Sequence, residues 1–344
     1  MITKLKLENF KGIKKGEIEL APLTILLGPN NAGKTTILEA LFLASNPLRK
    51  TPYITERGEL RALKVVSEIH KTLEHKGFLF LLNYYVSNYA EITCWIKDSI
   101  HKIAFVKRGM NLLVETNARV SSNLDGERGL YILAELYGST FRDSPMIYCD
   151  KPIIENSIMF HPLLYKLGVK YIRYNWTPLA NAGILMKVAE DVSHLSAEKY
   201  TDLTLEAFVR EELELNMYTR ERRRIRVGDI GDGIQSLVIY KILVEGYSPS
   251  IILWDDIEAH LNPRILMYIA DWVDDMVSHD KKQVIISTHS LEATELLASA
   301  SSHAKIMLIK LDKGLLKTKV LSPDELEELR KLGVDVRMAE GILL

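Results

Sequence analysis

The sequence predicts an α/β protein whose mixed or parallel core sheet is built around a phosphate-binding loop. An apolar run ends in Gly28–Thr35 (GPNNAGKT), which fits the pattern G-x-x-x-x-G-K-[ST] at every fixed position. After residue 226, apolar segments typical of buried strands alternate with segments of helical periodicity. Residues 2–8 and 17–20 alternate apolar and charged side chains, as strands of a half-exposed antiparallel sheet do.

The phosphate loop follows an apolar run over 23–27, expected as a buried strand, and precedes apolar residues at helical spacing over 37–42. Its two glycines let the backbone curl so that several N–H groups converge on a phosphate, and the next helix presents its positive end to the same anion. Lys34 can reach the terminal phosphates, and the Thr35 hydroxyl can bind magnesium. A glycine turn that fits the pattern by chance is the alternative, but the flanking strand and helix favour nucleotide binding.

Composition limits the classes of protein that are possible. The 344 residues are 47% hydrophobic and 26% charged, and the net charge of −1 argues against coating nucleic acid by bulk electrostatics. Cys94 and Cys149 show no metal-binding spacing, so we expect reduced core residues in a cytoplasmic protein. Neither a signal peptide nor a membrane-spanning apolar stretch is found, and no membrane partner is expected.

Periodicity predicts the remaining elements, and the chain divides into two parts of a nucleotide-binding lobe, 1–50 and 226–344, around an insertion, 51–225. The expected elements of the insertion are an amphipathic helix over 56–76, short antiparallel strands over 90–97, 102–107 and 111–116, a buried strand over 146–149, and a mainly helical part over 153–225 that includes a charged helix over 201–224. The expected elements after it are helices over 233–246, 263–277, 290–300 and 323–331, and strands over 250–255, 283–287, 305–311 and 315–320.

Carboxylates follow the apolar strand expected over 250–255. Buried parallel strands place ligand groups at their C-terminal ends, so Asp255 is the expected magnesium ligand beside the phosphate loop. Asp256 can orient or deprotonate an attacking water. An acidic, solvated turn is the alternative. His289 ends a second apolar strand in the same way and can hydrogen-bond the γ-phosphate or the water, although a structural role is its alternative.

Two further groups have open interpretations. Gly231, Asp232 and Gly233 form a turn that opens a helix, either as a second anion-binding turn or as a plain helix start capped by Asp232. The chain's basic cluster is expected at a solvated helix end, with phosphate or nucleic-acid contact as the alternative. It consists of Arg220, Arg222, Arg223, Arg224 and Arg226.

The order of these motifs resembles that of the ATP-binding-cassette-type AAA ATPases of the SMC, RecF and OLD group. The opening LKLENFKGIKKGEIELAPLTILLGPNNAGKTT resembles their first lobe, and IILWDDIEAHLNP resembles their Walker B and D-loop, with Leu261–Pro263 in the D-loop. The resemblance covers about residues 1–45 and 225–337. It implies a P-loop NTPase of the ABC-type ATPase head fold, with an N-terminal antiparallel β-subdomain and a small inserted α+β region.

The resemblance also implies roles for individual residues. Asp255 and Thr35 would hold Mg²⁺, Asp256 falls where the catalytic glutamate usually lies, and His289 is the switch histidine. Gly231, Asp232 and Gly233 take the place of the signature turn that binds a partner subunit's γ-phosphate, so a homodimer closed by ATP is implied. The other implied ATP contacts are Lys11 and the Walker A residues Gly28, Pro29, Asn30, Asn31, Ala32, Gly33, Lys34, Thr35 and Thr36.

Three departures from the family pattern have consequences. Gly231 stands where the family has the signature serine. The side-chain contact of that serine to the partner's γ-phosphate is therefore lost, unless Ser236 supplies it. Asp256 is one methylene shorter than glutamate, which predicts slow hydrolysis or a catalytic role for Glu258. No glutamine lies between Gly28 and Gln235, so the usual Q-loop ligand is absent, which argues against a transporter subunit. The tail after residue 289 is also too short for the Toprim nuclease domain of OLD proteins.

Two classes of function remain. The first is an ATPase whose ATP-gated dimerisation acts on DNA or a partner protein, in DNA repair or anti-viral defence. The second is a weakly hydrolysing regulatory module that controls a separately encoded nuclease or toxin. A transporter subunit or a small-molecule kinase is a third alternative. Partner specificity is expected in the insertion.

Overall fold

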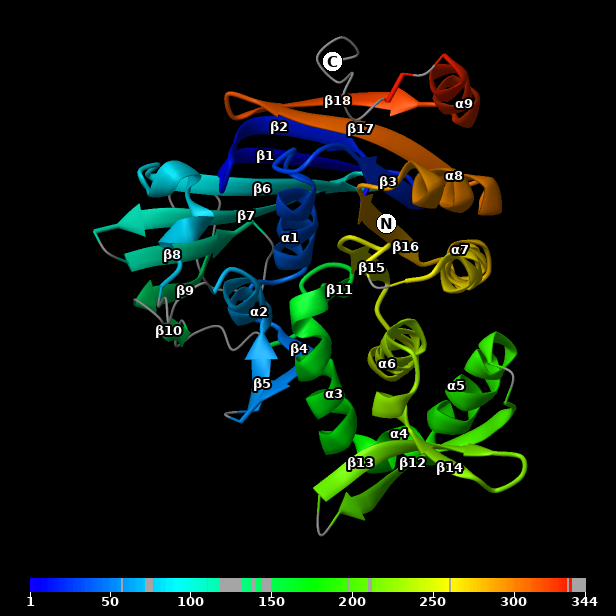
Figure 1. Cartoon of the computed structure of the whole chain (residues 1–344). Helices are drawn as coiled ribbons and strands as arrows, with labels where there is room; N and C mark the ends of the chain where they lie inside the picture. Colours follow the sequence, from blue (N-terminus) through cyan, green and yellow to red (C-terminus); the bar gives the residue numbers. More distant parts are fainter. Residues whose placement is uncertain are drawn as a thin grey trace.

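A computed structural model of the chain describes most of its length (Figure 1). The described residues are 1–56, 58–71, 77–109, 111–117, 131–137, 140–143, 150–196, 198–209, 212–259, 261–332 and 334–335. Within these ranges, no helix combines the length and apolar character that crossing a bilayer requires.

Thirteen strands of the described residues form one mixed sheet. From one edge to the other they are β10 (Thr140–Asp143), β9 (Tyr131–Tyr137), β8 (Asn111–Thr116), β7 (Ser99–Arg108), β6 (Tyr89–Ile96), β1 (Lys4–Phe10), β2 (Ile13–Glu19), β18 (Leu315–Leu321), β17 (Ala304–Asp312), β3 (Leu23–Leu27), β16 (Gln283–Thr288), β15 (Ile251–Trp254) and β11 (Ser157–Phe160).

The sheet has a parallel part and an antiparallel part. Strands β17, β3, β16, β15 and β11 run parallel to one another, whereas β10 to β2 form an antiparallel series and β18 pairs antiparallel with β17. Every residue of β3, β16, β15 and β11 is buried, as expected for parallel strands covered on both faces. The predicted α/β fold with a mixed core sheet and an N-terminal antiparallel region is therefore confirmed.

Helix α1 (Lys34–Ala44) lies between the two parts of the sheet (Figure 1). It contacts β1, β6 and β7 of the antiparallel part and β11, β15 and β16 of the parallel part. Its residues from Ile37 to Ala44 are all buried, because a helix enclosed on all sides has no solvent face to keep polar. The phosphate loop at its start is thereby held against both parts.

After residue 226, the chain matches its predicted elements to within a few residues. Helix α7 begins at Pro263, and the Asn262 side chain caps it by accepting from the Ile265 N–H at 3.0 Å. Ser322 and Glu325 form a capping box at the start of α9. The helices of this half are α6 (Asp232–Tyr247), α7 (Pro263–Ser278), α8 (Leu291–Ala300) and α9 (Pro323–Lys331).

The helix predicted over 56–76 is shorter in the structure. Helix α2 spans Ala62–Ile69, and β5 (Gly58–Arg61) precedes it in a hairpin with β4 (Lys50–Thr55). The Thr51 hydroxyl donates to the Leu60 carbonyl at 2.7 Å. Pairing with β4 thus competes with helix formation at the start of the segment.

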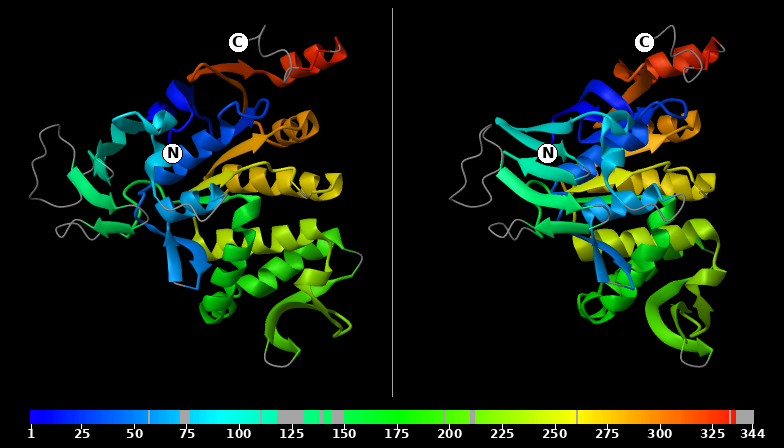
Figure 2. Two further views of the ribbon diagram at one scale, coloured as in Figure 1. Left: turned by 60° about the vertical axis from the view of Figure 1, so that its left-hand side comes forward. Right: turned by 90° about the vertical axis from the view of Figure 1, so that its left-hand side faces the viewer.

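The charged helix predicted over 201–224 is wrong. The segment forms a three-stranded antiparallel sheet of β12 (Tyr200–Val209), β13 (Glu212–Thr219) and β14 (Arg224–Arg226). Apolar residues alternate with polar ones here, and the paired Leu203 and Met217 are both buried. This period of two is the strand signal that the high charge of the segment concealed. Figure 2 shows this small curved sheet at the opposite end of the molecule from α9.

Residues 153–225 are accordingly only partly helical. Helix α5 packs against both β12 and α6 and connects the small sheet to the core. The helices of this segment are α3 (Tyr165–Tyr174), α4 (Trp176–Asn181) and α5 (Ile184–Val192).

The strands predicted over 90–97, 102–107 and 111–116 are present as β6, β7 and β8. They do not form a separate body, because β6 pairs with β1 from Trp95 opposite Lys4 to Glu91 opposite Glu8. They extend the N-terminal antiparallel region instead. Cys94 is buried and free, whereas Cys149 and the strand predicted over 146–149 lie outside the described residues. The division into 1–50, 51–225 and 226–344 stays a prediction.

Candidate nucleotide-binding site

The register of the parallel strands places four strand ends side by side. Leu27 of β3 lies opposite Thr288 of β16, Ile286 of β16 opposite Trp254 of β15, and Trp254 opposite Phe160 of β11. Parallel strands deliver the residues that follow them to one edge of the sheet. The residues after these ends include the predicted Gly28, Asp255 and His289, together with His161, which the sequence analysis did not single out.

The phosphate loop requires glycine at two positions for different reasons. A Cβ atom on Gly28 would lie 2.5 Å from the Ile309 carbonyl oxygen, so the backbone of β17 leaves no room for a side chain. Gly33 has φ +95°, a left-handed conformation that favours glycine. Helix α1 begins directly after Gly33, and its first N–H groups have no partner within the helix. This geometry suits an anion.

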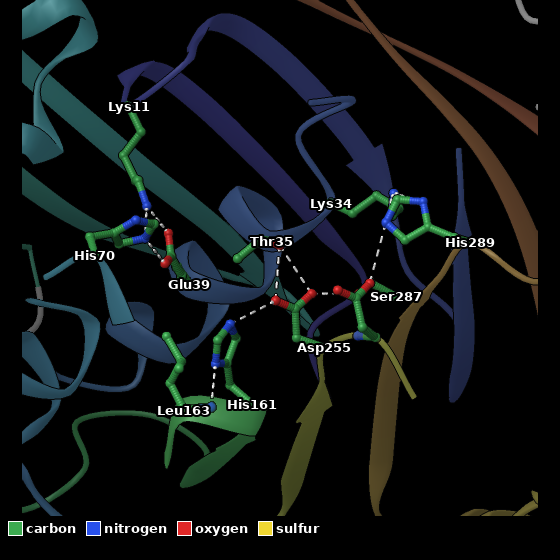
Figure 3. Close-up of polar contacts among 11 residues, drawn as sticks. Lys11, Lys34, Thr35, Glu39, His70, His161, Leu163, Asp255, Ser287 and His289 are labelled. Atoms are coloured by element: carbon green, nitrogen blue, oxygen red, sulfur yellow. Dashed lines mark hydrogen bonds and ion pairs between the residues drawn. The ribbon is translucent and has the colours of Figure 1, made fainter. Parts of the chain in front are cut away.

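Lys34 lies over the loop. Its ammonium donates to the carbonyl oxygens of Gly28 at 2.7 Å and Pro29 at 2.9 Å, and lies 3.2 Å from the ring nitrogens of His289. Burial lowers the pKa of Lys34, and the nearby Asp256 and Asp255 oppose this effect. The structure thus brings together the predicted phosphate ligand and the predicted switch histidine (Figure 3).

Thr35, in the first turn of α1, contacts Asp255, which directly follows β15 (Figure 3). The Thr35 hydroxyl lies 2.9 Å from Oδ2 and 3.1 Å from Oδ1 of Asp255, and the Ser287 hydroxyl donates to Oδ1 at 2.5 Å. The Asp255 side chain is only 2% exposed. Burial raises the pKa of Asp255 to about 6, although the bonds from Ser287 and Thr35 oppose this shift. The ionised Asp255 carboxylate is therefore a buried negative charge that its hydrogen bonds only partly stabilise.

These residues fit magnesium. A carboxylate and a hydroxyl are the hard oxygen donors that Mg²⁺ prefers, and the ion usually completes its shell with water and substrate phosphates. No cluster of three or more His, Cys, Asp or Glu side chains able to hold a metal occurs in the described residues. The pair at Thr35 and Asp255 is therefore suited to a cation that arrives with phosphate, and such a cation would neutralise the buried carboxylate.

Asp256 and Glu258 occupy different environments. Asp256 is 44% exposed on its side chain, and its Oδ1 lies 3.4 Å from Nε2 of His289. Its backbone has φ +49°, a left-handed conformation uncommon outside glycine, and its N–H donates to the Ser287 hydroxyl at 2.9 Å. Glu258 instead accepts the backbone N–H of His289 at 2.6 Å. Asp256 is thus the more accessible carboxylate, whereas Glu258 holds the segment that carries His289.

The glycine turn begins α6 without a side-chain cap. Gly231 is the N-cap residue and Asp232 is the first residue of the helix, so capping by Asp232 is wrong. Gly231 is exposed, and a Cβ atom there would meet nothing within 4 Å, whereas Gly233 is buried. A cavity of about 230 Å³ is lined both by Asp232 of this turn and by Asp255 and Asp256. The turn and the Walker B carboxylates thus face one space within a single chain.

Lys11 does not contact the phosphate loop in this structure. Its ammonium forms an ion pair with the fully buried Glu39 of α1 and lies 2.5 Å from Nε2 of His70 (Figure 3). Glu39 lies one helical turn after Thr35, so both side chains project from the same face of α1. The pKa of Glu39 is lowered despite its burial, because Lys11 and His70 stabilise the ionised carboxylate.

The remaining predicted features have structural contacts of their own. Leu261 lines the cavity beside Asp255, whereas His260 lies outside the described residues. In the basic cluster, Arg224 pairs with Glu206 at 3.0 Å and Arg226 pairs with Asp229 at 2.7 Å. The cluster lies around β14 and the turn before it, so the expected helix end is wrong.

His161 and Ser287 are site residues that the sequence analysis missed. His161 follows β11, the parallel strand farthest from the phosphate loop, and its side chain is 16% exposed with Nε2 3.7 Å from Oδ2 of Asp255. Burial lowers its pKa, although Glu39 and Asp256 oppose the shift. The available signal was the apolar run 157–160 directly before it, which has the same form as the runs that precede Asp255 and His289.

The mixed sheet and the site at its parallel edge define a P-loop ATPase fold of the ABC type. Family models support this assignment over most of the chain. A model described as AAA ATPase domain matches residues 1–135. A second AAA domain model, whose description adds AbiEii toxin and Type IV TA system, matches residues 156–295. Models of AAA-type ATPase domains thus match two successive parts of the chain, which supports its resemblance to the SMC, RecF and OLD group.

Individual relatives share short stretches with it. It is 42% identical over 66 residues to the DNA double-strand break repair Rad50 ATPase of Methanopyrus kandleri. This alignment covers 18% of this chain and 8% of that protein. It is 46% identical over 43 residues to the OLD nuclease of Thermus scotoductus, covering 12% and 8%. The aligned stretches therefore span less than a tenth of either relative.

Solved structures match over nearly the whole chain at low sequence identity. The SmcHead bound to the C-winged helix domain of ScpA superimposes with a TM-score of 0.57 at 18% identity and covers 96% of this chain and 99% of that one. The Smc head domain with an extended coiled coil from Pyrococcus furiosus, bound to the C-terminal domain of ScpA, gives 0.52 at 14% identity, covering 96% and 98%. These similarities establish the fold.

Proposed function

We propose that the chain binds ATP with Mg²⁺ at the phosphate loop and hydrolyses it slowly. One observation carries this proposal, namely the meeting of Thr35 and Asp255 at 2.9 Å beside the ammonium of Lys34. The loop N–H groups and Lys34 would bind the β- and γ-phosphates, and Thr35 and Asp255 would hold the ion. When bound, Mg²⁺ neutralises charge that develops on the phosphate oxygens.

The other polar residues fit roles in hydrolysis. Asp256, exposed and 3.4 Å from His289, would accept a proton from the attacking water or orient it. His289, 3.2 Å from Lys34, would donate to the γ-phosphate from the end of β16, the strand next to β3. An aspartate reaches less far than a glutamate would from the same backbone, which supports slow turnover.

ATP would also join two copies of the chain. The phosphate loop would surround the nucleotide of its own chain, so the backbone N–H groups at the start of α6 would be available for a second phosphate. A γ-phosphate held by a second copy would meet the exposed Gly231, which presents no side chain. We therefore propose a head-to-tail homodimer that closes on two ATP molecules. The closing of this dimer would act on DNA or on a partner protein, in DNA repair or anti-viral defence.

Light scattering tests the dimer directly. In Asp256→Asn, hydrolysis is blocked and ATP stays bound, so the variant should be a monomer or weak dimer alone and a dimer with Mg-ATP at tens of micromolar. The wild-type chain with Mg-ADP is the matched control and should remain in the nucleotide-free state. A monomer of Asp256→Asn with ATP demonstrably bound would refute the sandwich arrangement.

A regulatory module for a separately encoded nuclease or toxin is the second candidate. Two similarities favour it. The family model over residues 156–295 is described as that of an AbiEii toxin of a Type IV TA system, and a short stretch is similar to an OLD nuclease. Stimulation of hydrolysis by double-stranded DNA would favour the first candidate. If DNA has no effect, and a nuclease or toxin encoded beside this chain binds it only with ATP, the second would be favoured.

A further inference from the structure

His161 lies where it can control the predicted magnesium ligand. The strand pairing of Phe160 with Trp254 puts His161 level with Asp255 on the neighbouring strand, and the two side chains approach to 3.7 Å between Nε2 and Oδ2. Figure 3 shows the imidazole approaching the carboxylate from the side opposite Ser287. Ser287 is thus the neighbour of Oδ1 and His161 that of Oδ2, while the Thr35 hydroxyl lies close to both oxygens.

The hydrogen-bond partners define the tautomer of His161. Its Nδ1 accepts the backbone N–H of Leu163 at 3.1 Å, in the short 3₁₀ turn Pro162–Leu164 that follows β11. In a neutral imidazole, one nitrogen accepts and the other carries the hydrogen. Nε2 is consequently the N–H donor, and it faces Oδ2 of Asp255. A protonated nitrogen has no lone pair for a metal, so His161 is not suited to be a direct ligand.

The backbone around His161 is held firmly. Phe160 is buried, stacks on Tyr240 with ring centroids 4.3 Å apart, and meets Trp254 edge to face at 5.2 Å. The Asp255 N–H donates to the Phe160 carbonyl at 2.9 Å. These contacts link the backbone positions that carry the imidazole and the carboxylate. The 3.7 Å separation is then a property of the strand pair, and it can be bridged by a water or closed by a small rotation.

We propose that His161 is a positioning residue for Asp255, holding Oδ2 through its Nε2–H so that the carboxylate is oriented towards Mg²⁺ with the nucleotide. Ser287 holds Oδ1 in the same way from the other side. The proposal rests on the proposed function, because it assigns Asp255 to the metal. The chain has no glutamine between Gly28 and Gln235, so the usual Q-loop glutamine is absent. In this proposal, His161 is the polar side chain beside the Asp255 carboxylate.

Manganese provides a test that does not depend on turnover. Mn²⁺ would replace Mg²⁺, and its electron paramagnetic resonance signal would report metal binding in the presence of ADP. His161→Ala should weaken Mn²⁺ binding about 10-fold, the lower end of the range for loss of a partner that orients a metal ligand. ADP affinity in EDTA should stay as in the wild type. His161→Gln, whose amide N–H can also donate, should restore most of the metal affinity.

A matched control is His101→Gln, which changes another buried histidine. His101 donates from Nε2 to the Ala44 carbonyl at 3.0 Å and lies on β7. This control should leave Mn²⁺ affinity unchanged.

Each other outcome has a defined meaning. Wild-type Mn²⁺ affinity in His161→Ala would overturn the positioning role, as would a glutamine variant no better than the alanine variant. Equal loss of ADP affinity in EDTA would show that His161 only supports the fold. Failure of the wild-type chain itself to bind Mn²⁺ with ADP would refute the proposed function before any variant is compared.

Discussion

Replacing Asp255 by Asn should stabilise the chain in the absence of metal and nucleotide. Burial raises the pKa of Asp255 from 3.8 to about 6, so the folded state binds its proton more tightly than the unfolded state does. Below pH 3.8 both states are protonated and the carboxyl costs nothing. Above pH 6 both are ionised and the folded state bears the full cost of the buried charge, so this contribution destabilises increasingly as pH rises through that window.

The size of the effect follows from the shift. The difference of about 2.2 units (6 − 3.8) corresponds to about 3 kcal/mol at pH 8, since one unit is about 1.4 kcal/mol. At pH 4.5 the same two values leave a cost of about 1 kcal/mol. Asparagine has nearly the same shape and can still bond to the hydroxyls of Thr35 and Ser287. The Asp255→Asn variant should therefore gain about 3 kcal/mol at pH 8 and about 1 kcal/mol at pH 4.5.

Urea unfolding in EDTA, followed by tryptophan fluorescence at both pH values, measures this difference. Asp256→Asn is the matched control, because it makes the same chemical change on an adjacent side chain that is 44% exposed, and asparagine tolerates its left-handed backbone. It should change stability little at either pH. A destabilised Asp255→Asn at pH 8, or a gain independent of pH, would refute the argument that the metal site is an uncompensated buried charge.

The remaining predictions concern the nucleotide. Lys34→Ala should abolish ATP binding measured by titration calorimetry, because it removes the charge that faces the terminal phosphates; undiminished hydrolysis would contradict the phosphate-loop assignment. Asp256→Asn should retain ATP and slow phosphate release about 10²-fold or more, whereas Glu258→Gln, which keeps an acceptor for the His289 N–H, should turn over near the wild-type rate. Wild-type turnover in the first and none in the second would reverse these roles. Gly231→Arg, at an exposed position with free space around it, should bind ATP normally but fail to dimerise by light scattering, and a persistent ATP-dependent dimer would make the turn only a helix start.

Local sequence was sufficient for much of the site. The strand, loop and helix over 23–42 follow from adjacent residues, because glycine spacing and apolar periodicity act over a few positions. The assignments of Asp255 and His289 needed one further step, that carboxyl ends of parallel strands share an edge. The helices after residue 226 were also predictable, since proline and capping residues mark the starts of α7 and α9.

The errors arose where two local patterns compete. The segment that forms β12 and β13 carries many charges typical of a helix surface, together with an apolar alternation typical of a strand. Packing against α5 buries the alternating face at Leu203, so tertiary contact selects the strand. Likewise, only pairing with β1 shows that β6 to β8 extend the main sheet.

The sequence by itself determined that this chain carries a phosphate loop, a Walker B strand and the α/β order of an ABC-type head, because each of these is encoded within one short stretch. Only the tertiary structure decided what surrounds Asp255. His161, Thr35 and Ser287 come from three other elements, and strand register brings them to one carboxylate. The separate environments of Asp256 and Glu258 are likewise set by β16 and the segment after it. The physical reason is that register and burial are properties of pairs of segments distant in the chain, which no local pattern specifies.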